Sequence, residues 1–391
     1  MLSGCTIILL TISSTACLRT SGIPCRRDII SSSSQSHAES RRARFTKIAP
    51  TGYFLEANDH DGLTRYLQNQ GWIDSTETVM DLSPAGDGNM NCTLRVKTHE
   101  RTFILKQSRP WVEKYPEIAA PLDRAIQEGA FYEVVGSQPS LARMMPQLLA
   151  VNRESRMLML TDLGKASDFT GLYSGDILTG DAVDSLGRYL STLHTVELRS
   201  DCRQGFVNRD MRHLNHRHIF DLPLAQTGPG VNLDHLTKGL AVEAAQRRSD
   251  VEFCQAVKRL GEVYLQDGKA LLHGDFYPGS WVKTDKELYV IDPEFCFMGP
   301  PEFDLGVLLA HLRLSNQPQW VRMRVTEAYM ADSSFNKDLA AQFSGVEVMR
   351  RLLGVAQLPL QATLAQKRAW LDESRNLVCG PNNWEMIVCG D

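Results

Sequence analysis

Two short runs with strand-like spacing in the first half of the chain predict a β-hairpin. They occupy residues 93–96 and 102–105, and a polar turn joins them. A helical pattern over residues 122–135 follows, and residues 157–160 form a continuous apolar run typical of a buried strand. This order indicates a small lobe that mixes strands and helices.

Beyond about residue 164 the apolar residues recur mainly at helical spacing. Residues 183–193 and 256–265 are clear examples, and a loop-rich stretch over residues 272–301 interrupts the pattern. We therefore expect an α+β protein of two lobes. A small β-rich N-lobe would span residues 46–163, and a mainly helical C-lobe would span residues 164–391.

The first 45 residues fit neither lobe. Residues 7–12 form a short apolar run that no lysine or arginine precedes, and Ser-rich and Arg-rich stretches follow at residues 31–34 and 41–44. We interpret residues 1–45 as a disordered lead-in or a targeting segment. No later stretch reaches the ~20 apolar residues needed to span a bilayer, so we expect no membrane association and a cytoplasmic location, with export or targeting left open.

Charge and composition narrow the choice of partners. The chain has 391 residues, 43% of them hydrophobic, which is enough to bury a full core. A net charge of -4 provides no basic field for a nucleic acid, so a small-molecule substrate fits better. The nine cysteines form no C-x-x-C pair, which favours free thiols. His213, His216 and His218 lack neighbouring ligands at metal-binding spacing and are interpreted as a solvated or substrate-side segment.

The strongest chemical signal lies in two acidic loops, residues 273–280 and 292–295, each of which follows an apolar run. Phosphoryl transfer needs one carboxylate to orient the attacking hydroxyl and accept its proton, and others to hold Mg²⁺ against the phosphates. Asp275 suits the first role, and Asp292 with Glu294 suits the second. A surface turn competes as an interpretation of either loop alone, but the pair at this spacing favours catalysis.

A glycine-containing string before the hairpin is the candidate phosphate loop. Glycines there would free backbone N–H groups to cover ATP phosphates, although a surface turn is the commoner meaning of such a string alone. Lys106 ends the second strand, where it could contact the α/β-phosphates, and Glu128 on the following helix is a candidate partner for it. The candidate nucleotide-binding residues are Gly86, Gly88, Asn89, Asn91, Lys106 and Glu128.

Together these motifs resemble those of the aminoglycoside phosphotransferase and choline kinase-like family, and within it the S-methyl-5-thioribose kinases. The likeness covers about residues 53–377. It lies in the Gly-Asp-Gly-Asn-x-Asn string from Gly86, in Leu105-Lys106-Gln107, in a catalytic loop that ends in Gly279-Ser280, and in Asp292-Pro293-Glu294-Phe295 continuing to Phe303-Asp304. The resemblance implies a protein-kinase-like two-lobe fold with ATP and Mg²⁺ as cofactors.

The resemblance also reaches Arg350 and Arg351, in an Arg-Arg-x-x-Gly segment that in this family lies close to the sugar and the phosphates. Without the family, two arginines on a helix are more often a solvated face. The resemblance implies that both bind the substrate. The catalytic loop departs from the family where Phe276-Tyr277-Pro278 replaces an expected Leu-His-Thr, which puts the acceptor in doubt more than the chemistry.

We therefore expect an ATP-dependent kinase that transfers the γ-phosphoryl group to a hydroxyl of 5-methylthioribose or a related sugar, a step of methionine salvage. A kinase of the same fold that acts on an aminoglycoside, a choline-like amine or another small alcohol is the first alternative. The second is a non-catalytic nucleotide-binding protein, against which the joint presence of Lys106, Asp275, Asp292 and Glu294 argues. Whether the protein is a homodimer stays open.

Overall fold

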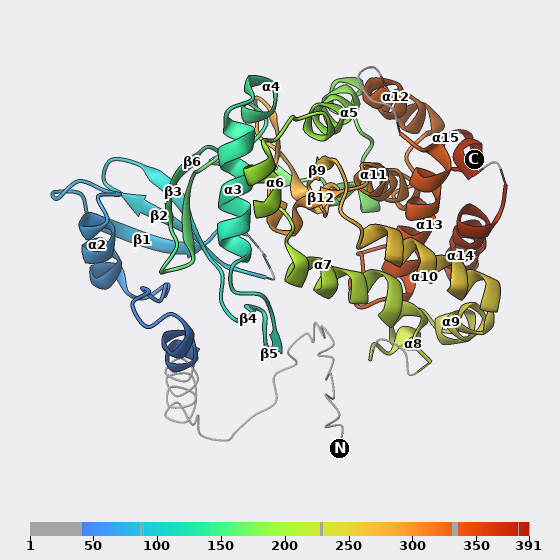
Figure 1. Cartoon of the computed structure of the whole chain (residues 1–391), viewed down its shortest axis with the longest axis horizontal. Helices are drawn as coiled ribbons and strands as arrows, with labels where there is room; N and C mark the ends of the chain where they lie inside the picture. The colour runs from blue at the N-terminus through green and yellow to red at the C-terminus, as the bar shows by residue number, and fades with distance from the viewer. Residues whose placement is uncertain are drawn as a thin grey trace, which may run out of the picture. The chain divides into compact units, whose positions relative to one another are not determined.

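The structure is a computed structural model that describes residues 41–390 except 87, 89, 227–229, 331–334 and 382. Two compact units make up the chain. One consists of the residues up to Leu122 together with Ala150–Leu158, and the other consists of Asp123–Leu149 and Met159–Asp391. Figure 1 shows strands dominating the first unit and helices the second, which confirms the predicted α+β class.

A five-stranded sheet with the strand order β1-β2-β3-β7-β6 supplies most of the strands of the first unit, and the outer ends of β6 and β7 fall in the second. Its strands are β1 (Val79–Pro84), β2 (Cys92–Thr98), β3 (Thr102–Gln107), β6 (Leu148–Asn152) and β7 (Met157–Thr161). The predicted hairpin is confirmed, because β2 and β3 pair antiparallel with Leu94 opposite Leu105 and Val96 opposite Phe103. All four of these side chains are buried, so they supply the apolar face of the hairpin.

Residues 41–48 form a helix that belongs to the folded first unit. Phe45 on this helix and Ala49 directly after it pack in a small core with Phe54 and Trp111, and Phe45 is fully buried. The expectation of a disordered lead-in is therefore wrong for residues 41–45, because an apolar pair one helical turn apart anchors them. The rest of that expected lead-in, up to residue 40, lies outside the described residues.

Shorter elements complete the first unit. The helix α2 (His60–Asn69) contacts β1, and the strands β4 (Trp111–Val112) and β5 (Tyr115–Ala119) form a second hairpin. Asp59 caps α2, because its carboxylate accepts a hydrogen bond from the Gly62 backbone N–H.

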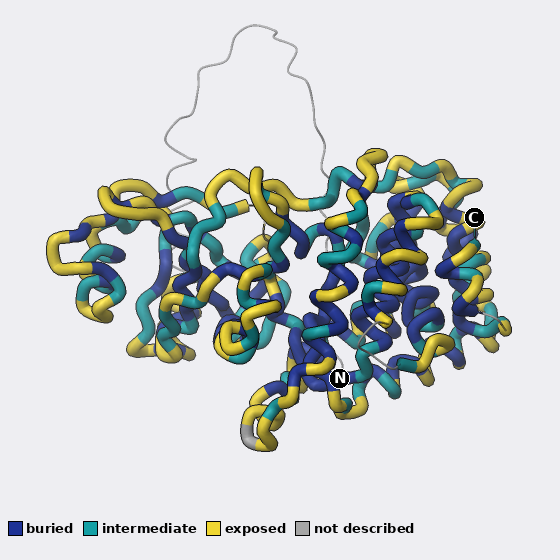
Figure 2. The backbone as a smooth tube through the Cα atoms, turned by 90° about the horizontal axis from the view of Figure 1, so that it is seen from above, coloured by how far each residue is buried: buried dark blue, intermediate teal, exposed yellow. Residues whose placement is uncertain are grey.

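Long helices form the core of the second unit. They are α3 (Arg124–Gly136), α5 (Gly180–His194), α10 (Val251–Tyr264), α11 (Glu302–Leu314), α13 (Lys337–Leu353) and α14 (Leu364–Cys379). The helices predicted over residues 122–135, 183–193 and 256–265 correspond to α3, α5 and α10. Nearly every residue of α11 is buried, and Figure 2 shows long buried stretches among these helices. A helix that is buried on all sides lies in the middle of a core rather than on its surface.

The remaining helices of the second unit are shorter or more peripheral. They are α4 (Pro139–Ala142), α6 (Ser200–Gly205), α7 (Arg209–His216), α8 (Leu233–Leu236), α9 (Leu240–Ser249), α12 (Gln319–Met330) and α15 (Asn383–Cys389). No helix in the described part of the chain combines the length and the apolar content that a bilayer crossing requires.

Two small antiparallel sheets in the second unit hold the acidic loops. The strand β9 (Ala270–Leu272) pairs with β12 (Phe297–Gly299), whereas β10 (Trp281–Lys283) pairs with β11 (Leu288–Val290) and with β8 (Ser167–Asp168). Residues 273–280 connect β9 to β10, and residues 291–296 connect β11 to β12. Because both loops run between the same two strand pairs, they lie next to each other.

Candidate active site

The two acidic loops touch at Gly274, one residue before Asp275. Gly274 has φ = 85°, and a Cβ atom at this position would lie 2.2 Å from the backbone oxygen of Phe295 in the other loop. Nε2 of His273 also lies 3.0 Å from the backbone oxygen of Ile291. Only glycine fits both the left-handed backbone and the close approach, so this residue joins the loop of Asp275 to the loop of Asp292.

Asp304, in the first turn of α11, holds the backbone of the loop that carries Asp275. Its carboxylate accepts hydrogen bonds from the backbone N–H groups of His273 at 2.6 Å and Gly274 at 3.0 Å, and it is fully buried. Nε2 of His194 lies 3.3 Å from the same carboxylate. Hydrogen bonds to a buried carboxylate are stronger than neutral ones, so Asp304 fixes the backbone that presents Asp275.

Asp275 is largely buried, and only part of its side chain is exposed. The exposed fraction is 21%, and Nη2 of Arg351 lies 3.3 Å from Oδ1. Burial raises the pKa of the Asp275 carboxyl above its ordinary value, while the positive charges of Arg351 and Arg350 oppose that rise. A carboxylate in such surroundings can orient a hydroxyl and accept its proton.

A buried glutamate on α13 organises the arginines near Asp275. Oε1 of Glu347 accepts a hydrogen bond from Nε of Arg351 at 2.6 Å, and Oε2 accepts one from Nη1 of Arg350 at 2.9 Å. Glu347 is 1% exposed. Burial alone would raise its pKa, but the two arginines outweigh that effect and lower the pKa. Glu347 is therefore ionised and holds both guanidinium groups.

His311 on α11 also contacts Glu347. Its Nε2 lies 3.0 Å from Oε1 of Glu347, and its Nδ1 lies 2.5 Å from the hydroxyl of Tyr173. Burial lowers the pKa of His311 to about 4, so the ring is neutral at physiological pH. A neutral ring with its proton on Nε2 donates to Glu347 and accepts from Tyr173.

The Asp292 loop presents two carboxylates with different surroundings. Asp292 is exposed and has φ = 62°, in the left-handed region that aspartate tolerates better than most residues. Glu294 is buried, and its Oε2 lies 3.7 Å from Nε of the buried Arg124 on α3. Carboxylate oxygens are the ligands that Mg²⁺ prefers, so Asp292 fits a metal role. The charge of Glu294 is already balanced by that arginine, so Glu294 fits the role of metal ligand less well.

The candidate phosphate-binding residues of the first unit lie on β3 and before β2. Lys106 is buried near the end of β3, opposite Thr93, and Gln107 beside it holds the backbone through bonds to Tyr53 and Ser155. Gly86 has φ = 98°, Gly88 is exposed and Asn91 is buried. Asn89 lies outside the described residues. The unit therefore holds Lys106 on a rigid strand.

Glu128, the candidate partner of Lys106, is fully buried on α3 of the second unit. Its pairing with Lys106 stays a prediction. The catalytic and metal candidates of the second unit lie on the adjacent loops described above, and Arg351 lies against Asp275. The second unit thus brings together Asp275, Asp292, Glu294, Arg350 and Arg351 around two loops and one helix.

Sequence reasoning assigned no role to Asp304, Glu347 or His311. Glu347 precedes the arginines by three and four residues, the spacing at which helical side chains meet, so the helical pair rule would have found it. Asp304 belongs to the segment on which the family resemblance rests. Nothing in the sequence alone shows that its carboxylate turns back to the loop of Asp275, thirty residues earlier.

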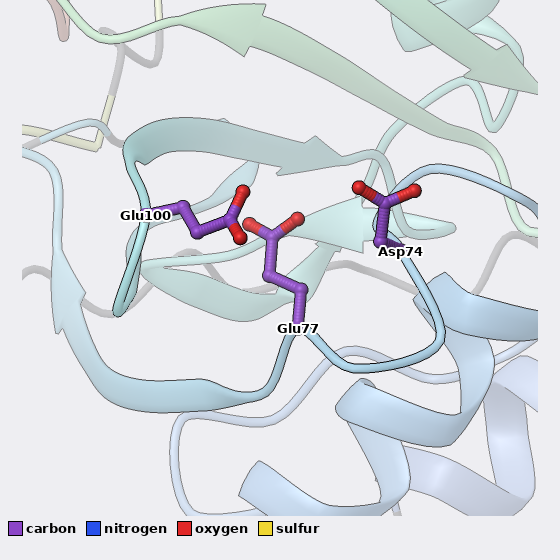
Figure 3. Close-up of side chains that lie close together, drawn as sticks. All are labelled: Asp74, Glu77 and Glu100. Atoms are coloured by element: carbon purple, nitrogen blue, oxygen red, sulfur yellow. The ribbon is translucent and has the colours of Figure 1, made fainter.

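The described residues also contain an acidic group distant in sequence from these loops. Asp74, Glu77 and Glu100 lie close enough to share a metal ion, as Figure 3 shows. Glu77 already accepts a hydrogen bond from Oγ1 of Thr98 at 2.7 Å and lies 3.3 Å from Nε of Arg101. Because internal partners occupy the buried member of the group, we assign it no metal.

Comparison with known proteins gives consistent matches. The family model described as the phosphotransferase enzyme family matches residues 81–341. A methylthioribose kinase of Exiguobacterium sibiricum is 29% identical over 255 residues, which cover 61% of this chain and 62% of that kinase. A methylthioribose kinase of Klebsiella pneumoniae is 24% identical over 335 residues, which cover 80% of this chain and 81% of that kinase. The chain thus spans about three fifths of the first of these two relatives.

Among solved structures, a spectinomycin phosphotransferase in complex with ADP and spectinomycin is similar at 12% identity. The match covers 83% of this chain and 98% of that chain, with a TM-score of 0.48.

Proposed function

This chain belongs to the phosphotransferase enzyme family, and from that premise we propose that it is an ATP-dependent kinase that phosphorylates a hydroxyl of 5-methylthioribose or a closely related sugar. The substrate follows from the methylthioribose kinases to which the chain is similar. The observation that carries the proposal is the pair of adjacent acidic loops. One presents Asp275, and the other presents Asp292 beside it.

In this proposal each residue has a defined role. Asp275 orients the acceptor hydroxyl and takes its proton as the γ-phosphoryl group is transferred. Lys106 and the backbone from Gly86 to Asn91 bind the ATP phosphates, with Glu128 orienting Lys106. Asp292, with Glu294, would hold Mg²⁺, which neutralises phosphate charge when bound. Arg350 and Arg351 are assigned to the acceptor side, because Arg351 contacts Asp275 and Arg350 precedes it on α13.

The charge around Asp275 favours a neutral sugar over a cationic acceptor. Arg351 contacts the Asp275 carboxylate, and Arg350 and Arg351 both donate hydrogen bonds to the buried Glu347. Aminoglycosides and choline-like amines carry positive charge and need carboxylate partners. Because Arg351 pairs with Asp275 and both arginines pair with Glu347, neither carboxylate lacks an arginine partner, so neither is left to bind such an acceptor.

The test is ADP release from Mg²⁺-ATP by the full chain, with methylthioribose, simple sugars, choline and a panel of aminoglycosides as acceptors. Turnover confined to methylthioribose or a related sugar is expected. Turnover on an aminoglycoside or choline would retain the family's chemistry but overturn the acceptor. Absence of turnover with every acceptor would favour a non-catalytic nucleotide-binding protein.

The variant Asp275→Asn provides the mechanistic control. It keeps the size of the side chain but removes the base, so kcat should fall by about 10³-fold or more while ATP binding, measured by calorimetry, stays close to wild type. Wild-type turnover by Asp275→Asn would remove Asp275 from the mechanism. Loss of ATP binding would instead mean that the substitution had disturbed the fold.

A further inference from the structure

The catalytic loop departs from the family pattern at three consecutive residues, of which one keeps part of its surface exposed. Phe276 is fully buried, and its ring packs against those of Tyr189 and Trp281 at centroid distances of 5.7 and 5.4 Å. Pro278 is also buried, whereas Tyr277 is only half-buried. Phe276 and Pro278 therefore serve the packing of the loop, and Tyr277 is the departure that can reach a ligand.

The Tyr277 ring lies against the side chains that surround Asp275. Its centroid is 4.7 Å from the guanidinium carbon of Arg351 and 5.2 Å from the ring centroid of His311. Nη2 of the same guanidinium lies 3.3 Å from Oδ1 of Asp275. Because the ring and the carboxylate contact one guanidinium group, both are within reach of one small acceptor.

The Tyr277 ring folds back over its own loop, where a glycine makes room for it. A Cβ atom at Gly279 would lie 2.5 Å from the Tyr277 hydroxyl oxygen. The Tyr277 backbone N–H donates to the backbone oxygen of Asp275 at 3.1 Å, and the backbone N–H of Ser280 donates to that of Tyr277 at 2.8 Å. The loop that presents Asp275 therefore also fixes the place of the Tyr277 hydroxyl.

The Tyr277 hydroxyl has no hydrogen-bond partner within the part of the chain that the structure describes. Buried tyrosine hydroxyls usually find a partner, but this oxygen is not fully buried. Burial and the charge of Asp275 raise the pKa of Tyr277 to about 12, against the opposing charge of Arg351. The hydroxyl therefore keeps its proton at physiological pH, and it can both donate and accept a hydrogen bond.

We propose that Tyr277 is a specificity-determining residue whose hydroxyl binds a second hydroxyl of the acceptor, next to the one that Asp275 deprotonates. The inference rests on the proposed function and narrows its acceptor to a molecule with two neighbouring hydroxyl groups. A phosphate oxygen is bound more strongly by a cation, whereas a neutral phenol matches a neutral alcohol. A site built to bond a hydroxyl rejects an analogue that lacks it, because the protein group is then left unpaired.

The test combines Tyr277→Phe, which removes only the hydroxyl, with analogues of methylthioribose that each lack one hydroxyl. In ADP release from Mg²⁺-ATP, Tyr277→Phe should lower kcat/KM for methylthioribose about 10-fold, mainly through KM, with the KM for ATP within about 3-fold of wild type. For one analogue the wild type should show a similar loss, and Tyr277→Phe should add less than about 3-fold to it, because the partner hydroxyl is already gone.

Two results of this comparison would overturn the inference. Losses that multiply for every analogue would mean that Tyr277 contacts none of the missing hydroxyls. A raised KM for ATP at an unchanged acceptor KM would place the Tyr277 hydroxyl on the phosphates instead.

Two further variants serve as controls. Tyr289→Phe on β11 removes a hydroxyl that donates to Glu287 at 2.9 Å, and it should leave kcat, both KM values and the discrimination among analogues unchanged. Tyr277→His, which restores the residue expected in the family, keeps a donor and should lose less kcat/KM than Tyr277→Phe. An equal loss in both Tyr277 variants would contradict a hydrogen bond from this position.

Calorimetry separates this inference from the proposed function. If the wild-type chain turns over no acceptor, the proposed function fails, and the Kd values for methylthioribose and its analogues then decide the contact alone. A Kd about 10-fold higher in Tyr277→Phe, with little further rise for one analogue, would support the contact. An unchanged Kd, or no binding of methylthioribose by the wild type, would overturn it. Turnover confined to an acceptor with a single hydroxyl, such as choline, would overturn it as well.

Discussion

Asp292 combines an exposed carboxylate with a backbone conformation that few side chains adopt. Non-glycine residues in the left-handed region cost roughly 1 kcal/mol or more, and such strain persists where the surroundings impose it. Proline follows directly, which restricts the loop further. The conformation therefore fixes the direction in which Asp292 leaves the loop, as a metal ligand requires.

We expect Asp292→Asn to weaken the use of Mg²⁺ without loss of fold. Asparagine tolerates the same backbone conformation, so the unfolding free energy should change by less than about 1 kcal/mol. The Mg²⁺ concentration for half-maximal ADP release should rise by about 10-fold or more, because the charged ligand is lost. An unchanged Mg²⁺ requirement would contradict the assignment. Asp285→Asn, in the nearby β10–β11 turn, serves as the matched surface control.

At the residue scale, the sequence indicates the candidate catalytic and metal-binding residues more readily than the residues that hold them in place. Asp275 and Asp292 follow apolar runs in glycine- and proline-containing loops, so their spacing alone suggests phosphoryl transfer. The supports are side chains such as Asp304 and Glu347, each buried on a helix far along the chain. Their roles depend on tertiary contacts, which a sequence pattern does not encode.

The elements around the site are unusually short, and this limits what periodicity predicts. The strands β9 to β12 have three residues each, too few to display a period of two, so the sequence indicates only a loop-rich region there. The longer β2, β3, α5 and α10 give clear patterns and are predicted correctly. The helix over residues 41–48 was missed because its first residues are mostly arginine.

At Gly274 the two short loops lie so close together that a single added atom, a Cβ, would clash with the facing backbone. We expect Gly274→Ala to lower the unfolding free energy by about 2–4 kcal/mol, because the added Cβ meets the Phe295 backbone and the residue must keep a positive φ. Displacement of Asp275 should also lower kcat by about 100-fold. Denaturant unfolding and ADP release measure the two effects.

The control for this substitution is Gly136→Ala, at the end of α3, where a Cβ atom meets no neighbour within 4 Å. Its unfolding free energy should stay within about 1 kcal/mol of wild type, since alanine is tolerated in a helix. If Gly274→Ala behaved like this control, the close approach of the two loops would not be a constraint in solution.

At the scale of the whole molecule, buried ionisable groups make stability depend on pH. His311 is fully buried and has a pKa of about 4, below the ordinary value of 6.5. As the pH falls from about 6.5 to about 4, this histidine binds a proton in the unfolded chain but stays neutral in the folded chain. The free energy of unfolding therefore decreases across that window. Glu347 has a lowered pKa, so its contribution is present above its ordinary value of 4.5 and is lost at lower pH.

We expect the unfolding free energy to fall by about 3 kcal/mol between pH 6.5 and pH 4 through His311 alone, given 1.36 kcal/mol per pKa unit. His311→Gln should be less stable at neutral pH but should show a shallower slope across this window. Urea unfolding followed by far-UV circular dichroism measures both. His99→Gln, an exposed position between β2 and β3, should keep the wild-type slope. An unchanged slope in His311→Gln would refute the assignment.

The placement of Glu347, Arg350 and Arg351 on one helix has a consequence for how this protein can change. An α-helix turns about 100° per residue, so one residue inserted between Glu347 and Arg350 would change the spacings from three and four to four and five. Arg350 would stay within reach of the carboxylate, but Arg351 would turn away from it. Substitutions on the opposite face of α13 leave the spacing intact. Five consecutive residues thus act as a cassette that can be moved or redesigned as a whole but cannot be lengthened.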